Sequence, residues 1–286
     1  MFQKQITRAD LVQDFHRFGI PFGGLLMVHS SLSSIGYVTG GADTVVDALL
    51  EVLGPEGTLV VPTFTDESAM NPSFIFDPSS TPSMVGAISE AVRRRPEAHR
   101  SIHGWHSVSA MGRLADAIAK DVGLSPWLPD GPMSKVIDYG GEFMLLGVPY
   151  KRLTLVHLME WECGVIYRPG RIVEVQMRCP DGSIGKLVNL ECPPESPFPG
   201  NDFNRLGRAM EEEGIVRLGV VGNAITRVFQ GRDVRSMSRK LHQKDKQAFL
   251  RQGGVVTELS YGNNVSMPRG DLCVVDPKVI YRPYQR

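Results

Sequence analysis

Apolar residues follow two different periods along the chain, and these periods predict alternating helices and strands. Near the N-terminus, Thr7 and Asp10 form a capping-box pattern, and apolar residues then recur at helical spacing until Gly19. Short apolar runs are typical of buried strands, whereas longer segments with one apolar face indicate helices. Strands are therefore expected at 25–28, 58–61, 107–111 and 143–148, with a further apolar run at 215–221. Helices are expected at 7–18, 43–53, 83–95, 154–161, 202–213 and 232–250.

Two segments differ from this alternation. Residues 171–177 and 186–190 flank the turn at 180–183 and predict a hairpin, and residues 271–275 predict a C-terminal strand. The 30 glycines and 20 prolines are spread along the chain and do not gather in a linker. We therefore expect an α/β sandwich with a mixed sheet, built as a single large domain over residues 1–286 with no clear internal boundary.

The composition narrows the classes of function. The chain has 286 residues, of which 42% are hydrophobic, and its 31 Lys and Arg residues balance 31 Asp and Glu residues. Without excess positive charge, binding to nucleic acid or to an anionic membrane surface is disfavoured. The N-terminal segment mixes charged and apolar residues and shows no signal peptide or membrane span, so a cytoplasmic protein is expected.

One pair of residues has the spacing of a general base and its orienting carboxylate. His157 and Glu160 are three residues apart on a predicted helix, so their side chains can meet. A carboxylate in this position fixes the imidazole tautomer and raises the basicity of the other ring nitrogen. A solvated or structural pair is the alternative, and from the pattern alone it is the commoner explanation.

The cysteines suggest no covalent or redox chemistry. They lie far apart and form no CxxC pair: Cys163, Cys179, Cys192 and Cys273. Reduced thiols are expected. Cys163 is near His157 in sequence, but six residues of helix set the two side chains about 120° apart unless the helix ends between them. A packed free thiol is therefore preferred over a Cys-His nucleophile.

Polar residues gather where the predicted strands end. Ser30, Ser31 and Ser33 follow the first strand, and residues 62–65 follow the second. Ligands bind at the carboxyl ends of strands in open α/β sheets, where hydroxyl and backbone N–H groups can hold phosphates or a pantetheine amide. A polar turn is an equally good interpretation. The nearby glycines match neither a P-loop nor a dinucleotide fingerprint.

Three histidines crowd one segment and raise the alternative of a metal-dependent hydrolase. Imidazole is a frequent ligand of zinc, and His99, His103 and His106 lie within one short stretch. No carboxylate or cysteine close in sequence completes the set. Ordinary loop histidines are therefore favoured, and no metal is expected.

Several short sequence blocks, each occurring once, follow one another over nearly the whole chain, and such an ordered series is more specific than any single motif. They are residues 28–32 (Val-His-Ser-Ser-Leu), 53–64, 76–78, 81–82, 100–101, 106–108 and 145–147, followed by Thr154, His157, Glu160 and 167–168. This ordered series resembles the aminoglycoside 3-N-acetyltransferase family, also called the antibiotic N-acetyltransferases. Gly104 stands where many relatives carry proline, which suggests a differently shaped cofactor channel.

The resemblance implies a three-layer α/β/α sandwich and an enzyme of antibiotic resistance. It implies acetyl-CoA as donor, an aminoglycoside amine as acceptor (the 3-amino group of 2-deoxystreptamine), His157 as general base and Glu160 behind it. The implied cofactor contacts are Ser30, Ser31, Leu32, Ser33, Thr63, Phe64, Ser107 and Val108. Because aminoglycosides are polycations, a local acidic patch is needed, for which the candidates are Asp66, Glu67, Asp77 and Glu162.

The substrate and the assembly stay open at this point. The acceptor could be another metabolic amine, and a coenzyme A-binding module without chemistry is a further alternative, although the intact His157 and Glu160 argue against it. A homodimer is compatible with the sequence.

Overall fold

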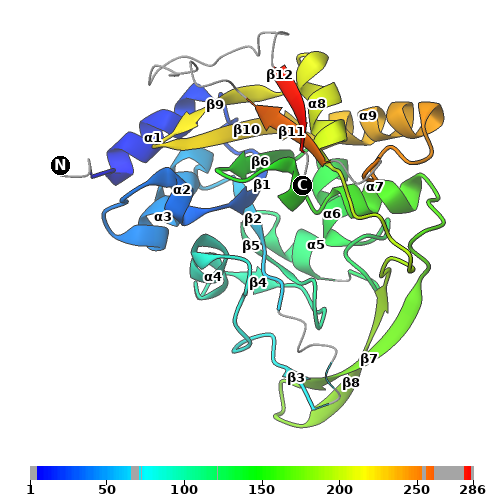
Figure 1. Ribbon diagram of the computed structural model, residues 1–286. Helices are drawn as coiled ribbons and strands as arrows, with labels where there is room; N and C mark the ends of the chain where they lie inside the picture. Colours follow the sequence, from blue (N-terminus) through cyan, green and yellow to red (C-terminus); the bar gives the residue numbers. More distant parts are fainter. Residues whose placement is uncertain are drawn as a thin grey trace.

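A mixed sheet of seven strands forms the centre of the molecule in the order β4-β5-β2-β1-β6-β10-β9 (Figure 1). The computed structural model describes residues 5–65, 71, 73–120, 122–252, 256–260 and 280–284. The central strands β1 (Leu25–Ser30), β2 (Thr58–Pro62) and β6 (Glu142–Leu146) are parallel. The flanking strands are antiparallel to their inner neighbours: β5 (Val108–Gly112), β4 (His99–Arg100), β10 (Ala224–Gln230) and β9 (Arg217–Val221).

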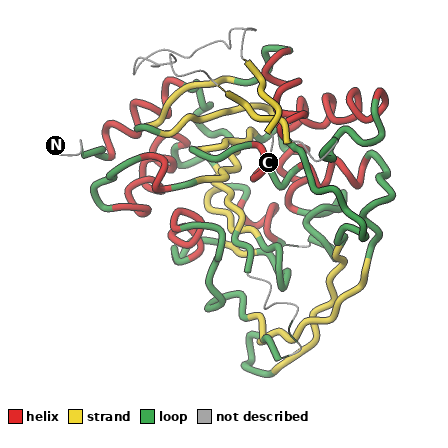
Figure 2. Tube along the Cα trace, in the orientation of Figure 1, coloured by secondary structure: helices red, strands yellow, loops and turns green. Residues whose placement is uncertain are grey.

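Helices cover both faces of this sheet and complete three layers (Figure 2). Alternate residues of β1 point to opposite faces, so that Leu26 and Val28 join one core whereas Leu25 and Met27 join the other. The first core is covered by α1 (Arg8–Arg17), α3 (Gly41–Leu53) and α4 (Ala87–Arg93). The second is covered by α5 (Ala115–Ala119), α6 (Pro132–Asp138), α7 (Val156–Glu162), α8 (Asn204–Glu212) and α9 (Gly231–Lys244).

Two smaller sheets accompany the central one. Strand β3 (Ile75–Phe76) runs parallel to β7 (Arg171–Arg178), which pairs antiparallel with β8 (Ile184–Glu191) as the predicted hairpin. This sheet extends away from the central sheet (Figure 1). Strands β11 (Val256–Ser260) and β12 (Ile280–Tyr284) form an antiparallel pair. Among the described residues, no helix has the length and apolar character needed to cross a bilayer.

Most predicted elements are confirmed, including the capping box of Thr7 and Asp10 at α1. The start of the helix predicted at 83–95 was wrong: α4 begins after Gly86, because the N–H of Ser83 donates to the Glu90 carboxylate and no side chain caps the helix. Helix α9 ends at Lys244, earlier than predicted. Strand β10 was missed because it buries Thr226 and Arg227 side by side, which hides its alternation. The strand predicted at 271–275 lies outside the described residues.

Candidate active site

Two cavities lie beside each other near the carboxyl ends of the parallel strands. The first, of about 520 Å³, has His157, Glu160, Trp127, His106 and Glu191 in its wall and is called the His157 cavity below. The second, of about 980 Å³, is called the Ser31 cavity, and its wall comes from the segments that leave β1, β2 and β6. The predicted location of the site at these strand ends agrees with this arrangement.

The wall between the cavities is aromatic. Phe64 lines the Ser31 cavity, and its ring contacts Trp127 and His106 of the His157 cavity at centroid distances of 6.0 and 5.0 Å. The His157 ring lies edge-on to Trp127 and to Phe203, with both centroids 5.3 Å away. Packing against two aromatic rings limits the orientations that the imidazole can take.

His157 and Glu160 form the pair that their spacing predicts. On α7, His157 Nδ1 lies 2.7 Å from Glu160 Oε2. Glu160 is 1% exposed, and its other oxygen accepts the hydroxyl of Tyr167 at 3.0 Å. Arg168 Nε forms an ion pair with Glu160 Oε2 at 2.9 Å. A carboxylate held on both oxygens in this way is a rigid partner for the imidazole.

The surroundings of Glu160 keep it ionised. Burial by itself acts to raise its pKa, but the hydrogen bond from His157 and the charges of His157 and Arg168 lower the pKa below its ordinary value. The pKa of Tyr167 is raised, first by burial and then by the neighbouring Glu160 charge, so its hydroxyl stays a proton donor. Since an ionised carboxylate only accepts, His157 carries its proton on Nδ1 and leaves Nε2 as a hydrogen-bond acceptor.

The serine cluster begins at the end of β1. Ser30, Ser31, Leu32 and Ser33 line the Ser31 cavity, as does Phe64. Ser31 Oγ lies 3.1 Å from Ser33 Oγ and accepts the hydroxyl of Ser34 at 2.9 Å. The short helix α2 (Leu32–Ile35) starts directly after Ser31. The hydroxyls of Ser31, Ser33 and Ser34 are therefore ordered by their contacts with one another.

Two basic residues that were not predicted from the sequence also line this cavity. Lys151 and Arg152 line it, on the 3₁₀ helix η2 (Tyr150–Arg152) that follows β6. Both are exposed, so their charges are available to an anionic ligand. Their position a few residues after an apolar strand, whose carboxyl end lies at the same sheet edge as the serines, was the available signal.

Three predicted cofactor contacts are instead buried structural residues. Thr63, Ser107 and Val108 are all fully buried and belong to the wall of neither cavity. Ser107 Oγ donates to the carbonyl of Thr63 at 2.8 Å and accepts Arg100 Nε at 2.9 Å. Because their polar atoms join β2 to β5, the structure gives them no route to a ligand.

His29 ties the two strand-end regions together. Its Nε2 lies 2.9 Å from the hydroxyl of Thr154, just before α7. Burial lowers the pKa of His29 to about 4, so the ring is neutral at pH 7. This contact joins the end of β1 in the Ser31 cavity to the start of the helix that carries His157.

The two described acidic residues among those proposed for substrate binding, Asp77 and Glu162, do not reach the site. Asp66 and Glu67 lie outside the described residues. Asp77 is engaged by Ser79 and Ser80 in its own loop, and Glu162 pairs with Arg235 and Arg239 on α9. Neither Asp77 nor Glu162 lines either cavity. The carboxylates that do line the His157 cavity are Glu160 and Glu191.

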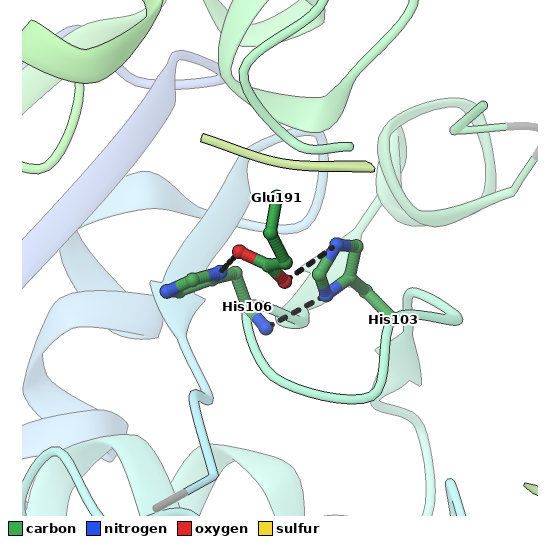
Figure 3. A group of neighbouring side chains, drawn as sticks. All are labelled: His103, His106 and Glu191. Carbon is green, nitrogen blue, oxygen red and sulfur yellow. Dashed lines mark hydrogen bonds and ion pairs between the residues drawn. The ribbon is translucent and has the colours of Figure 1, made fainter. Parts of the chain in front are cut away.

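The histidine segment divides into two parts. His99 is exposed and pairs with Asp116. His103 and His106 lie close to Glu191, a residue far away in the sequence, at the end of β8 (Figure 3). No carboxylate close in sequence was expected to complete a metal-binding set with these histidines. In the folded protein Glu191, on the β7–β8 hairpin, lies beside His103 and His106.

Cys163 is a packed thiol at the end of α7. It packs against the core, and burial followed by the charge of Glu162 raises its pKa. A raised pKa lowers the thiolate fraction and with it nucleophilicity.

Replacing Cys163 with Ala is therefore expected to leave kcat within about threefold of the parent. Turnover and intact-protein mass after incubation with acetyl-CoA test this. An acetyl group trapped on Cys163, together with an inactive variant, would show a covalent route.

Comparison with known proteins decides the family. The sequence profile described as aminoglycoside 3-N-acetyltransferase matches residues 27–243. The chain belongs to this family. It is 33% identical to aminoglycoside N(3)-acetyltransferase VII of Streptomyces paromomycinus, over 80% of this chain and 88% of that protein. As a member of the family, the chain is an acyltransferase.

Solved structures of relatives support the same family fold. The apoenzyme of aminoglycoside acetyltransferase AAC(3)-IVa is 29% identical and matches with a TM-score of 0.76, over 88% of this chain and 94% of that one. A mutant of AAC(3)-IVa in complex with apramycin is 27% identical and matches with a TM-score of 0.74, over 87% of this chain and 96% of that one.

Proposed function

We propose that this family member transfers the acetyl group of acetyl-CoA to an amine of an aminoglycoside, the 3-amino group of a 2-deoxystreptamine ring, with His157 as general base. The observation that carries the proposal is the His157–Glu160 pair, which lies in one cavity while a second, larger cavity adjoins it across Phe64. Two adjoining cavities suit a reaction in which donor and acceptor are bound together.

The Ser31 cavity is the proposed donor site. Lys151 and Arg152 provide positive charge for the phosphates of coenzyme A, and Ser31 and Ser33 provide hydroxyls for the amides of its pantetheine arm. The backbone N–H of Ser31 is not available to a ligand, because it already donates to the carbonyl of Leu146 at 2.9 Å. The hydroxyls therefore carry the proposed polar contacts at this position.

The proposed transfer is direct. His157 Nε2 takes a proton from the acceptor amine, whose nitrogen attacks the thioester carbonyl; the C–N bond forms, the C–S bond breaks, and the proton then passes to the leaving thiolate. Glu160 stabilises the imidazolium that forms in between. Trp127 and Phe203 keep the ring in place during both proton transfers.

A thiol-release assay with acetyl-CoA tests the activity. We expect coenzyme A release with kanamycin-type or gentamicin-type compounds, without added metal, and mass spectrometry of the product should place one acetyl group on the 2-deoxystreptamine ring. Turnover that requires zinc and is lost with a chelator would contradict this mechanism, as would release no faster than hydrolysis.

The donor site can be tested with Ser31→Trp. An indole directly after β1 should occupy part of the Ser31 cavity and weaken acetyl-CoA binding at least tenfold by calorimetry. Ser183→Trp is the matched control, because Ser183 is exposed in the β7–β8 turn. Unchanged affinity in a folded Ser31→Trp protein would move the donor site elsewhere.

An amine other than an aminoglycoside is the second candidate acceptor. The balanced charge of the His157 cavity supports this alternative. Arg168 and Arg171 line this cavity together with Glu160 and Glu191, so among its described residues positive and negative groups balance. A polycation gains most from an excess of carboxylates, whereas an amine of low charge needs none. Simple amines in the same assay distinguish the two.

A further inference from the structure

A second imidazole and carboxylate pair lies in the wall of the His157 cavity. His106 and Glu191 both line it, and His106 Nδ1 is 3.2 Å from Glu191 Oε2. The Trp127 ring centroid is 5.4 Å from His106 and 5.3 Å from His157. The two imidazoles thus both contact the same indole, and the separation of their ring centroids is at most the sum of these two distances.

Glu191 is held in this position from behind by His103. The two residues approach at His103 Nε2 and Glu191 Oε1, 3.6 Å apart, and both side chains are almost fully buried (Figure 3). Asn189, two residues earlier on β8, accepts the N–H of Gly104 at 3.0 Å and so fixes the strand against the loop. The carboxylate therefore has a defined place beside His106.

The proton positions argue against a cation in this cluster. His103, His106 and Glu191 offer ligand atoms within 4.8 Å of one another, and two imidazoles with a carboxylate are a set that zinc uses. However, His103 Nδ1 accepts the backbone N–H groups of Trp105 and His106, at 3.2 and 2.9 Å. Nδ1 thus holds no proton, so the neutral ring carries it on Nε2 and has no lone pair there for a metal.

The same reasoning gives His106 a free acceptor. Its Nδ1 is buried and has no hydrogen-bond partner among the described residues, but it lies 3.2 Å from Glu191 Oε2; a proton on Nδ1 faces that carboxylate oxygen, whereas a lone pair there would meet another lone pair, so the tautomer with the proton on Nδ1 is favoured. The side chain is 19% exposed, and this exposed part excludes Nδ1. The other ring nitrogen, Nε2, lies on the side of the ring away from Glu191 (Figure 3). His106 therefore has the same tautomer as His157, with the proton on Nδ1 and an acceptor at Nε2.

We propose that His106, oriented by Glu191, is a second binding residue of the His157 cavity, whose Nε2 accepts a hydrogen bond from a second amino or hydroxyl group of the acceptor. The inference rests on the function proposed above and makes it more specific: the cavity selects acceptors with two donor groups, one at His157 and one at His106. A ring that carries two amines, such as 2-deoxystreptamine, has this chemistry.

Calorimetric binding without acetyl-CoA tests the subsite independently of turnover. The probes are 2-deoxystreptamine, with two amines, and cyclohexylamine, with one. His106→Phe and Glu191→Gln should weaken 2-deoxystreptamine binding about 10- to 100-fold, as expected for a lost hydrogen bond to a charged group. Cyclohexylamine binding should stay within about threefold. His106→Gln, which retains an acceptor oxygen, should recover part of the loss, and exposed His99→Phe should match the parent.

Several results would overturn the inference. The inference fails if folded His106→Phe and Glu191→Gln bind 2-deoxystreptamine with unchanged affinity. It also fails if the two probes lose affinity equally, or if the parent protein does not bind 2-deoxystreptamine. Stoichiometric zinc binding that disappears in Glu191→Gln would assign the cluster to a metal. Thiol release is measured separately: binding that depends on His106 without any turnover would contradict the proposed transfer and support the subsite.

Discussion

Replacing His157 with Ala is expected to lower kcat by about 10²- to 10⁴-fold, the usual contribution of a positioned general base. The melting temperature should stay close to that of the parent. The His157 side chain is 23% exposed and borders a cavity, so its truncation enlarges an existing space and opens none in the core. Glu160 also keeps Tyr167 and Arg168 as partners. Steady-state kinetics and thermal unfolding on the same preparation test both statements.

His99→Ala is the matched control for this experiment. His99 is an exposed histidine on β4 that pairs with Asp116 and lines neither cavity. Its replacement should leave both kcat and the melting temperature near the parent values. Full activity in folded His157→Ala would remove the proposed base, and a large fall in melting temperature with unchanged kcat per folded molecule would make the His157–Glu160 pair structural.

Replacing Glu160 with Gln should have the larger effect on stability and the smaller effect on rate. The substitution keeps the shape of the side chain but removes a buried charge that pairs with Arg168, whose own side chain is mostly buried. Arg168 keeps its hydrogen bonds to Cys192 and Asn201 but loses its charged partner, which should lower the free energy of unfolding by about 2 to 4 kcal/mol. We expect kcat to fall about 10- to 100-fold, because the imidazolium loses its stabilising charge. Urea unfolding and steady-state kinetics measure the two effects.

The pH dependence provides a second test of Glu160. Its pKa in the folded protein is below the ordinary value of 4.5, so its contribution to stability is fully present above pH 4.5 and is lost as the pH falls through the folded value. The stability difference between the parent and Glu160→Gln should therefore be constant near neutral pH and shrink in acid. A difference that grows on acidification would contradict this assignment.

Glu162→Gln controls for a carboxylate on the same helix. Glu162 pairs with Arg235 and Arg239 outside the cavities, and Arg235 keeps Asp138 as a second partner. The expected loss of stability is smaller than that of Glu160→Gln, because Arg239 is largely exposed and Arg235 keeps Asp138, and kcat should change little. Equal losses in the two variants would mean that the position of Glu160 in the cavity has no special role.

The sequence by itself determined most of the elements and the candidate pair of His157 and Glu160, because both depend on short-range geometry. Apolar periodicity located β1, β2 and α3 through the local rules for strands and helices. The contact of His157 with Glu160 follows from helical spacing alone, since residues three apart share one face. The serines after β1 were located by the general rule that strand ends in open sheets bind ligands.

The tertiary structure alone decided which predicted residues reach a cavity. Thr63 and Ser107 have the same hydroxyl groups as Ser31, but the antiparallel pairing of β2 with β5 buries them. Glu162 lies two residues after Glu160, which is about 200° of rotation around the helix. Its side chain therefore turns toward α9, where it pairs with Arg235.

The environment of His106 was also decided by tertiary structure. Glu191 reaches His106 only because β8 folds back on the 103–106 loop, through the contact of Asn189 with Gly104. Spacing along the chain gives no information about such a contact, since the hairpin that carries Glu191 is placed by long-range packing and not by its own sequence.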